Sequence, residues 1–390
     1  MASELRKLFI DRRLWLGPAP CLVLILAGVN VWIFASSPSL EQRRVTTLLG
    51  ADPTTTISPS EADYDISCGE AMGAYWPYIP DSRQQRLVVL SGMSQMFTIN
   101  DRKPGDRTIS QWMDDTLKPQ GVRVWGEAAP NLCNEEATML LLAFCAEQRT
   151  TPAVFIYGLC FDKFRNVDLR PGYQDFLRSR PDIEKEWKAT AERIASTYPL
   201  ASAKMLSTLN DLHASSAAEE NTFESRLRAR VGSWLPLVEQ RKNIYVTVGL
   251  YLYQARNKIL HITPTTKRPI ILSRFDLNKQ FLSLMADIAR EHHVQLILYV
   301  IPLNPLAENP YVPEQYEAFK VYARQFAEER GIPFANLEDV VPQGMWGIFN
   351  GGPDFKHFRE EGHERTAKAV MAAFEPWLDG TATSTTSIMR

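Results

Sequence analysis

The chain has 390 residues, with 43 Lys and Arg against 45 Asp and Glu and a formal net charge of -2. This balance, without a basic block or an acidic tail, argues against nucleic-acid binding and against a cation buffer. The hydrophobic content of 45% is ample for a folded core, and the length allows either several domains or one large domain with an anchor.

An uncharged apolar segment covers residues 14–35. At about 1.5 Å per helical residue it is long enough to cross a hydrocarbon core of roughly 30 Å. Four basic residues precede it, namely Arg6, Lys7, Arg12 and Arg13. Because positive charge stays on the inner side, we expect a cytoplasmic stretch over 1–13, a single-pass membrane anchor over 14–36 and an extracytoplasmic remainder, periplasmic in a Gram-negative cell. A cleaved signal peptide is the alternative, although bulky Trp32 and Phe34 suit a cleavage region poorly.

The composition changes twice after the predicted anchor. Residues 36 to about 65 are rich in Ser, Thr and Pro, so we expect a stalk or lead-in between membrane and domain over 37–80. Residues 81–379 carry the apolar segments of a folded domain, and residues 380–390 are typical of a disordered tail.

Strand and helix signals alternate along the folded domain. In chain order we expect a strand at 86–90, a helix at 108–117, a strand at 122–125, a helix at 134–148 capped by Asn134, a strand at 153–157, a helix at 277–293, a strand at 294–301, a helix at 313–330, a strand at 333–335 and a helix at 360–378. This alternation implies an α/β fold, a three-layer αβα sandwich of flavodoxin-like type around a parallel sheet of about five strands. A helical insertion over about 172–269 interrupts the alternation, and within it the apolar run 244–259 is interpreted as buried.

Four cysteines lie beyond the predicted anchor: Cys68, Cys133, Cys145 and Cys160. In an oxidising compartment an even number of cysteines favours pairing, so we expect at least one disulfide among them. The alternative for Cys145, which stands in an apolar helix, is a small buried hydrophobic residue.

Ser94 follows the first strand of the predicted domain, in the sequence LVVLSGMS. Ligands of open parallel sheets bind where strands end at their carboxyl edge, and Gly92 permits a tight turn before the serine. Ser94 is therefore a candidate nucleophile, although a serine that caps a helix leaves the same pattern.

Asp354 and His357 stand three residues apart in GGPDFKHF, after a Gly-Gly-Pro turn and ahead of the last helix. One short loop would present both side chains to the same pocket. A neutral His is a suitable base for a serine hydroxyl near pH 7, and the Asp can fix its tautomer. Nucleophile first, with Asp and His last and close together, is one layout of a serine hydrolase triad. The competing interpretation is a capping Asp beside a surface His.

A metal site is not indicated. His357, His363 and Glu364 are close in sequence, but the two His are six positions apart and one helix face would not present both. We expect no metal and no cofactor.

These blocks together resemble the SGNH (GDSL-like) serine esterases and acyltransferases, over about Arg86 to Leu378 without the insertion. Ser94 falls in the first block, with Gly-Met-Ser in place of Gly-Asp-Ser, and Asp354 and His357 fall in the fifth block, followed by Gly362. The resemblance implies catalytic roles for Ser94, Asp354 and His357. In layout the chain is most similar to membrane-anchored members of the DltD-like and alginate-acetylation type.

The resemblance also implies groups that stabilise an oxyanion or bind substrate. Gly126 is the candidate in the second block. In the third block Gly158 is in place, but Cys160 stands where the family has Asn, and Asn166 lies off register. Asp162 and Arg165, after the third strand, are further candidates for pocket lining, or else they pair with each other.

The sequence supports two hypotheses. The first is an exported serine O-acyltransferase or acylesterase that acts on an envelope polysaccharide through an acyl-serine, with an acyl donor and a multi-pass membrane O-acyltransferase as partners. The second is a catalytically weak binding or scaffold partner of such an acyltransferase, which the missing Asn favours.

Overall fold

The computed structural model describes residues 66–68, 76–221, 259, 266–349 and 352–381. The chain divides into two compact units. The larger unit consists of Leu48–Ala51, Ile57–His213 and Pro264–Arg390 and holds the elements discussed below. Of the other unit, the structure describes little beyond the end of one helix. The predicted anchor at 14–36, most of the apolar run at 244–259 and residues 382–390 of the predicted tail lie outside the described residues. No helix within the described ranges is long and apolar enough to cross a membrane.

A parallel sheet forms the centre of the larger unit, with the strand order β1-β3-β2-β4-β5-β6. Its strands are β1 (Ile66–Cys68), β2 (Arg86–Gly92), β3 (Val122–Ala128), β4 (Val154–Leu159), β5 (Gln295–Val300) and β6 (Phe334–Asn336). The strand order turns back at β2, because β3 pairs with one side of it and β4 with the other. In open α/β sheets this switch point is where ligands bind, at the carboxyl ends of the strands.

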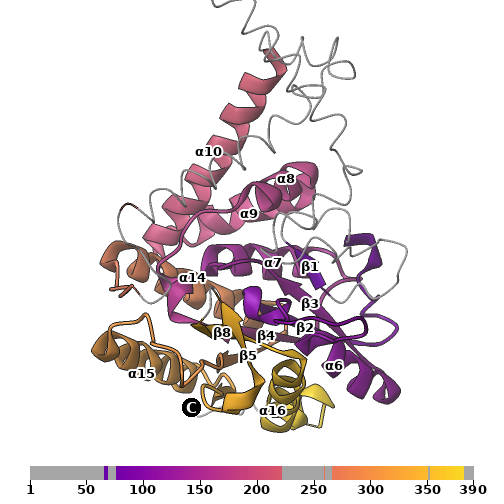
Figure 1. Cartoon of the computed structure of the whole chain (residues 1–390). Coiled ribbons are helices and arrows are strands. Elements are labelled where there is room, and N and C mark those ends of the chain that lie inside the picture. Colours follow the sequence, from indigo (N-terminus) through magenta and orange to yellow (C-terminus); the bar gives the residue numbers. More distant parts are fainter. Residues whose placement is uncertain (1–65, 69–75, 222–258, 260–265, 350–351, 382–390) are drawn as a thin grey trace, which may run out of the picture. The chain divides into compact units, whose positions relative to one another are not determined.

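Helices cover both faces of the sheet, as the alternation of elements predicts (Figure 1). On one face lie α6 (Ile109–Leu117) and α16 (Glu360–Leu378), and on the other lie α7 (Asn134–Ala146) and α14 (Leu272–Glu291). Further helices are α8 (Pro171–Ser179), α9 (Pro181–Arg193), α10 (Pro199–Asn221) and α15 (Pro313–Glu329). Because the central strands are covered on both faces, they are largely apolar, and Val88, Val89 and Leu90 are fully buried.

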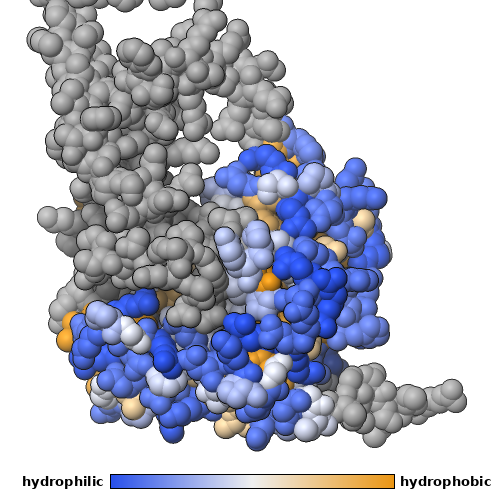
Figure 2. Space-filling model, turned by 90° about the vertical axis from the view of Figure 1, so that its right-hand side faces the viewer, coloured by the Kyte–Doolittle hydropathy of each residue, from blue (hydrophilic) through white to orange (hydrophobic). Residues whose placement is uncertain are grey.

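On the face shown in Figure 2, the surface of the described residues is mostly hydrophilic, and apolar residues form small separate spots among polar ones. Scattered exposed apolar residues of this kind are normal on a protein surface.

The sheet has one strand more than the sequence predicts. Strand β1 pairs with β3 in parallel and places Ile66 opposite Gly126. Trp76, which begins a short 3₁₀ turn (Trp76–Tyr78), is buried in the core at 5% exposure. Residues 66–80 therefore belong in part to the folded domain, and the boundary predicted at residue 81 is too late. A Ser/Thr/Pro-rich composition conceals a three-residue edge strand because so short a strand has no periodicity of its own.

The predicted helical insertion is helical over its described first half, through α8, α9 and α10. The predicted cap of α7 is wrong by one residue. Cys133 is the N-cap, and Glu136 accepts a hydrogen bond from its backbone N–H at 2.9 Å. Asn134 is instead buried, and its side-chain oxygen accepts a hydrogen bond from the Tyr157 hydroxyl at 2.8 Å.

The expected disulfide is absent from the described residues. Cys133, Cys145 and Cys160 are all free and buried, so none of them pairs with another or with Cys68. Cys160 contacts the Tyr311 hydroxyl at 3.3 Å, and Cys133 lies 3.8 Å from the carbonyl of Asp168. These thiols behave as small packed side chains, the alternative that the sequence offers for Cys145.

A second, two-stranded sheet follows β6. Strands β7 (Trp346–Phe349) and β8 (Gly352–Phe358) pair antiparallel. The sequence predicts a loop for Asp354 and His357, but both lie within β8. The period-2 alternation is easily missed because Lys356, a residue depleted in strands, stands at a buried position.

Candidate active site

Ser94 lies two residues beyond the end of β2, at the switch point of the sheet. It begins a one-turn 3₁₀ helix, η2 (Ser94–Met96), and is 9% exposed. The turn is tight enough that a Cβ atom on Gly92 would stand 2.2 Å from the sulfur of Met96. A glycine is therefore needed at position 92 for this close approach.

Ser94, His357 and Asp354 form a continuous hydrogen-bonded series. Ser94 Oγ lies 2.8 Å from His357 Nε2, and His357 Nδ1 lies 2.9 Å from Asp354 Oδ2. The second Asp354 oxygen accepts hydrogen bonds from the backbone N–H groups of Lys356, at 3.0 Å, and His357, at 3.1 Å. With Nδ1–H donating to the carboxylate, Nε2 is left to accept the serine hydroxyl, which is the arrangement of a nucleophile and its base.

The charges of this series suit a base that is neutral near pH 7. Burial of Asp354 opposes ionisation, but the hydrogen bond and charge of His357 lower the pKa of the carboxyl to about 2. Burial lowers the pKa of His357 below its ordinary value; the hydrogen bond to Asp354 opposes this shift, and the charge of Lys356 adds to it. Asp354 is thus ionised and His357 unprotonated at neutral pH.

Three amide side chains, which the sequence does not single out, fix β8 against the carboxyl edge of the sheet. Gln95 donates from Nε2 to the carbonyls of Pro302, at 2.8 Å, and Lys356, at 2.7 Å. Asn304, after β5, donates to the Asp354 carbonyl at 2.8 Å. Asn100 donates to the His357 carbonyl at 3.2 Å. These contacts join segments that are far apart in sequence, and no local pattern announces them.

Lys356 and Asn131 complete the surroundings of the series. The Lys356 ammonium donates to Asn131 Oδ1 at 3.2 Å, and Lys356 is 9% exposed. Asn131 stands in the segment after β3 and has a φ of 52°, a left-handed conformation that Asn tolerates better than most residues. The segment is tied to the end of β2 by a hydrogen bond of 3.3 Å from Ala129 N–H to the Gly92 carbonyl. The sequence does contain a signal for Asn131, because the pair Pro130-Asn131 follows the second predicted strand.

The two candidate glycines lie inside the sheet. Gly126 is in register with Ile66 and Leu90, two residues before β3 ends. Gly158 pairs with Tyr299 in β4, and a Cβ atom there would stand 2.9 Å from the Tyr299 ring. The glycine at 158 is thus explained by packing.

Asp162 and Asn166 follow β4 and differ in their surroundings. Asp162 is 5% exposed and accepts hydrogen bonds from Arg268, at 2.7 Å, and the Tyr311 hydroxyl, at 3.2 Å. The predicted contact with Arg165 is present as a longer ion pair of 3.8 Å. Asn166 donates to the Asn131 carbonyl at 3.5 Å, so it lies beside the loop that faces the candidate triad.

His363 is a buried core residue. It is fully buried, its Nε2 lies 3.1 Å from the Thr98 carbonyl, and its ring meets Phe358 edge to face. Burial lowers the pKa of His363 to about 3. Within the described part of the chain, no group of three or more His, Cys, Asp or Glu side chains could hold a metal ion.

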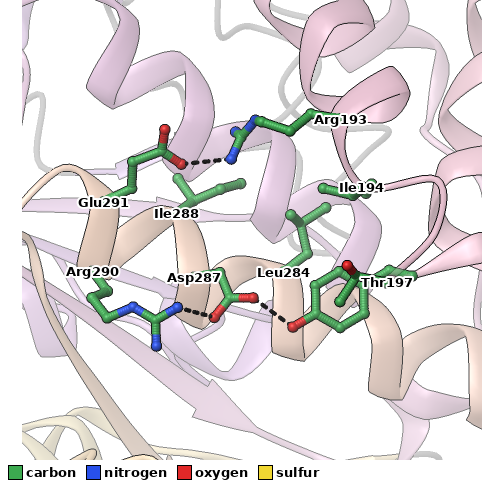
Figure 3. Close-up of a pocket in the computed structure, with 9 residues that line it drawn as sticks. Arg193, Ile194, Thr197, Leu284, Asp287, Ile288, Arg290 and Glu291 are labelled. Carbon is green, nitrogen blue, oxygen red and sulfur yellow. Dashed lines mark hydrogen bonds and ion pairs between the residues drawn. The ribbon is translucent and has the colours of Figure 1, made fainter.

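Two surface pockets differ in their relation to these residues. One, between α9 and α14, is lined by Arg193, Leu284, Asp287 and Glu291 among others and contains no member of the series (Figure 3). Its charged groups are paired with one another, as Arg193 with Glu291 at 2.9 Å. The other is lined by Asn100, Arg359 and Glu360 among others, and it too contains no member of the series. Its link to the candidate triad is the hydrogen bond from Asn100 to the His357 carbonyl.

No family model matches the chain, and no curated protein matches it at a significant level. Solved structures do match. A protein from Bacteroides fragilis, provisionally assigned as an acylhydrolase, aligns with a TM-score of 0.35 and 11% identity over 82% of this chain and 100% of its own. A GDSL-like lipase from Bacteroides thetaiotaomicron aligns with a TM-score of 0.35 and 11% identity over 79% of this chain and 98% of its own. At these values neither protein decides what this chain does.

Proposed function

We propose that the protein is a serine-dependent acyl-transfer enzyme of the SGNH type, with Ser94 as nucleophile, His357 as base and Asp354 as the group that orients the base. One observation carries the proposal: two hydrogen bonds, of 2.8 and 2.9 Å, join the three side chains in the order that the chemistry needs. The nucleophile also lies at the sheet's switch point, where the fold places ligands.

The reaction has two steps. Ser94 Oγ forms a bond to the acyl carbonyl carbon while its proton passes to His357 Nε2, and the carbonyl electrons move onto oxygen. Collapse of this intermediate restores the carbonyl and expels the first alcohol, which takes the proton from His357. A second hydroxyl then attacks the acyl-serine by the same steps in reverse. The backbone N–H of Ser94 is one donor to the oxyanion.

We further propose that the domain works outside the cytoplasm on an envelope polymer. The support is the uncharged run at 14–35 behind four basic residues, together with the resemblance to anchored acyltransferases. A multi-pass membrane O-acyltransferase would supply the acyl group, and the polysaccharide would accept it. A reporter that is active only in the cytoplasm, fused after Arg390, should be silent; a strong signal would reverse the topology.

The missing Asn favours transfer over hydrolysis. Cys160 stands at that position, and unless another group replaces the amide, losing one oxyanion donor costs about 10²–10³ in rate. Water gains nothing from remote contacts, whereas a bound polymer can use its own contacts to position a hydroxyl. An acyl donor should therefore turn over slowly alone and faster with the right glycan. Fast turnover of simple esters that no glycan changes would make the protein an ordinary esterase.

The alternative is a binding or scaffold protein that keeps the fold with weak chemistry, and Cys160 in place of Asn is the observation that favours it. A fluorophosphonate probe separates the two, because only an activated serine reacts. The enzyme should be labelled at Ser94, with Ser94→Ala as the control. If the probe does not label the folded wild-type protein, the scaffold function is favoured over the enzyme.

A further inference from the structure

Lys356 is held in place by two backbone contacts with the candidate triad and its neighbour. Its N–H donates to Asp354 Oδ1 at 3.0 Å, and its carbonyl accepts from Gln95 Nε2 at 2.7 Å. In sequence Lys356 thus lies between Asp354 and His357, on β8. Both its backbone N–H and its backbone carbonyl are hydrogen-bonded. Its side chain leads from this strand to Asn131, in the loop after β3.

The ammonium of Lys356 has little compensation for its charge. It is part of a residue that is 9% exposed, it donates to one neutral oxygen, Asn131 Oδ1 at 3.2 Å, and it lies 5.4 Å from the centre of the Phe355 ring. Among the described residues, no carboxylate lies within ion-pair distance of it. Lysines are almost never buried unless they are paired, because an isolated charge loses its hydration. The site therefore has a nearly buried cation that lacks an anion.

The same charge acts at the base and at the position of the missing Asn. It adds to burial in lowering the pKa of His357. Burial and the charge of Asp162 raise the pKa of the Cys160 thiol, and the Lys356 charge opposes that rise. The Lys356 charge thus acts on both the base and Cys160, and the hydrogen bond to Asn131 places the ammonium at the loop after β3, which Ala129 ties to the Gly92 carbonyl at the end of β2.

On the basis of the proposed function, we propose that the Lys356 ammonium, positioned by Asn131, is the side-chain donor that stabilises the oxyanion at Ser94. As the serine oxygen bonds to the acyl carbon, negative charge develops on the carbonyl oxygen, and the ammonium supplies the opposite charge. When the intermediate collapses, the electrons return to the carbonyl and Lys356 keeps its proton throughout. A fixed charge in a site of low dielectric stabilises such a transition state strongly.

The experiment measures the second-order rate of Ser94 labelling by a neutral fluorophosphonate, together with kcat and KM for a neutral ester. Lys356→Met removes the charge and keeps the length of the side chain; we expect labelling and kcat to fall about 10²–10³-fold with KM little changed. Lys356→Arg should recover part of the rate. Asn131→Asp should also slow both reactions, because it gives the ammonium a permanent carboxylate partner. Lys368→Met removes an exposed charge from α16, 63% exposed at its side chain, and should change nothing.

Rates are compared at a pH where His357 is neutral in every variant, since loss of the Lys356 charge also raises the pKa of the base. Wild-type labelling rates in a folded Lys356→Met protein would overturn the assignment while leaving Ser94 as nucleophile. If Lys356→Met raised only the KM of anionic substrates, the ammonium would bind a fixed anion on the substrate, and the oxyanion assignment would also be overturned. If the probe does not label the wild-type protein, the proposed function itself is contradicted. If Lys356→Met does not fold, the labelling rate of Asn131→Asp tests the assignment instead, because this variant retains the lysine.

Discussion

Gln95, the residue after the candidate nucleophile, donates a hydrogen bond of 2.7 Å to the main-chain carbonyl of Lys356, the residue before the candidate base. A second bond from the same amide nitrogen, of 2.8 Å, reaches the carbonyl of Pro302 beyond the end of β5. Gln95 is 1% exposed, so water does not replace these bonds. One buried side chain thus sets where β8 lies relative to the serine.

We expect Gln95→Leu to slow Ser94 labelling by about 10–100-fold, because β8 would shift and a displacement of about 1 Å can cost that much. Stability should fall by about 1–3 kcal/mol, since two buried carbonyls lose their donor. Labelling kinetics and chemical denaturation measure the two effects. Gln343→Leu, at an exposed position near the same hairpin, is the matched control. An unchanged labelling rate in a folded Gln95→Leu protein would show that other contacts position β8.

Ser94→Ala and His357→Ala should each abolish labelling and acyl release. Because the two side chains act as a unit, the double variant should be little worse than either single one. A double-mutant comparison of residual ester hydrolysis tests this. Additive losses, or full activity of Ser94→Ala with an unchanged melting temperature, would place the nucleophile elsewhere.

The pH profile reflects the lowered pKa of His357. The base works only when unprotonated, so kcat/KM should rise with pH and then level off, with the midpoint of the rise below the ordinary histidine pKa of about 6.5. Asp354 raises the pKa of His357 through its hydrogen bond and charge. Asp354→Asn should therefore move the acidic limb to still lower pH while reducing the plateau. A limb that stays in place in this variant would contradict the coupling of the two residues.

Lys163 predicts a pH dependence of stability that is separate from catalysis. It is fully buried, its ammonium lies 3.7 Å from the centre of the Tyr157 ring, and no described group accepts a hydrogen bond from it. Burial lowers the pKa of Lys163 to about 7, although nearby Cys160, Cys133 and Glu136 oppose the shift. The folded protein thus binds fewer protons than the unfolded chain between pH 7 and about 10.4, and the stability contributed by Lys163 rises with pH across that window.

Lys163→Met should therefore stabilise the protein by about 1–3 kcal/mol at pH 7 and by less at pH 9.5, the lost contact with Tyr157 offsetting part of the gain. Chemical denaturation at the two pH values measures the difference. Lys188→Met, at a side chain 63% exposed, serves as the control and should show no such change. A constant difference between Lys163→Met and wild type at both pH values would mean that the lysine is charged in the folded state.

The alternation of apolar strands and amphipathic helices made the parallel sheet predictable, and every predicted strand between residues 86 and 335 is present. Strand β1 was not predictable in the same way, because a three-residue edge strand depends on pairing with β3. The hairpin β7–β8 was missed for a related reason. It packs against loops at the sheet's carboxyl edge, and Lys356 interrupts its apolar alternation.

Ser94, Asp354 and His357 could be singled out because their chemistry and their order in the chain mark them. Gln95, Asn100 and Asn304 could not, since an amide that binds a distant carbonyl leaves no periodic signal. Gly158 shows the converse difficulty. This glycine in a motif position is explained by packing against Tyr299, which only the register of the strands reveals.

The hairpin that carries Asp354 and His357 is a sheet of its own, apart from the strand that leads to Ser94. The serine and its base are 263 positions apart in sequence and meet only when this hairpin settles on the edge of the central sheet. A chain that has formed its central sheet alone holds a serine without a base. Covalent reactivity at Ser94 therefore reports that folding is complete, because a chain whose hairpin has not yet docked holds the serine without its base.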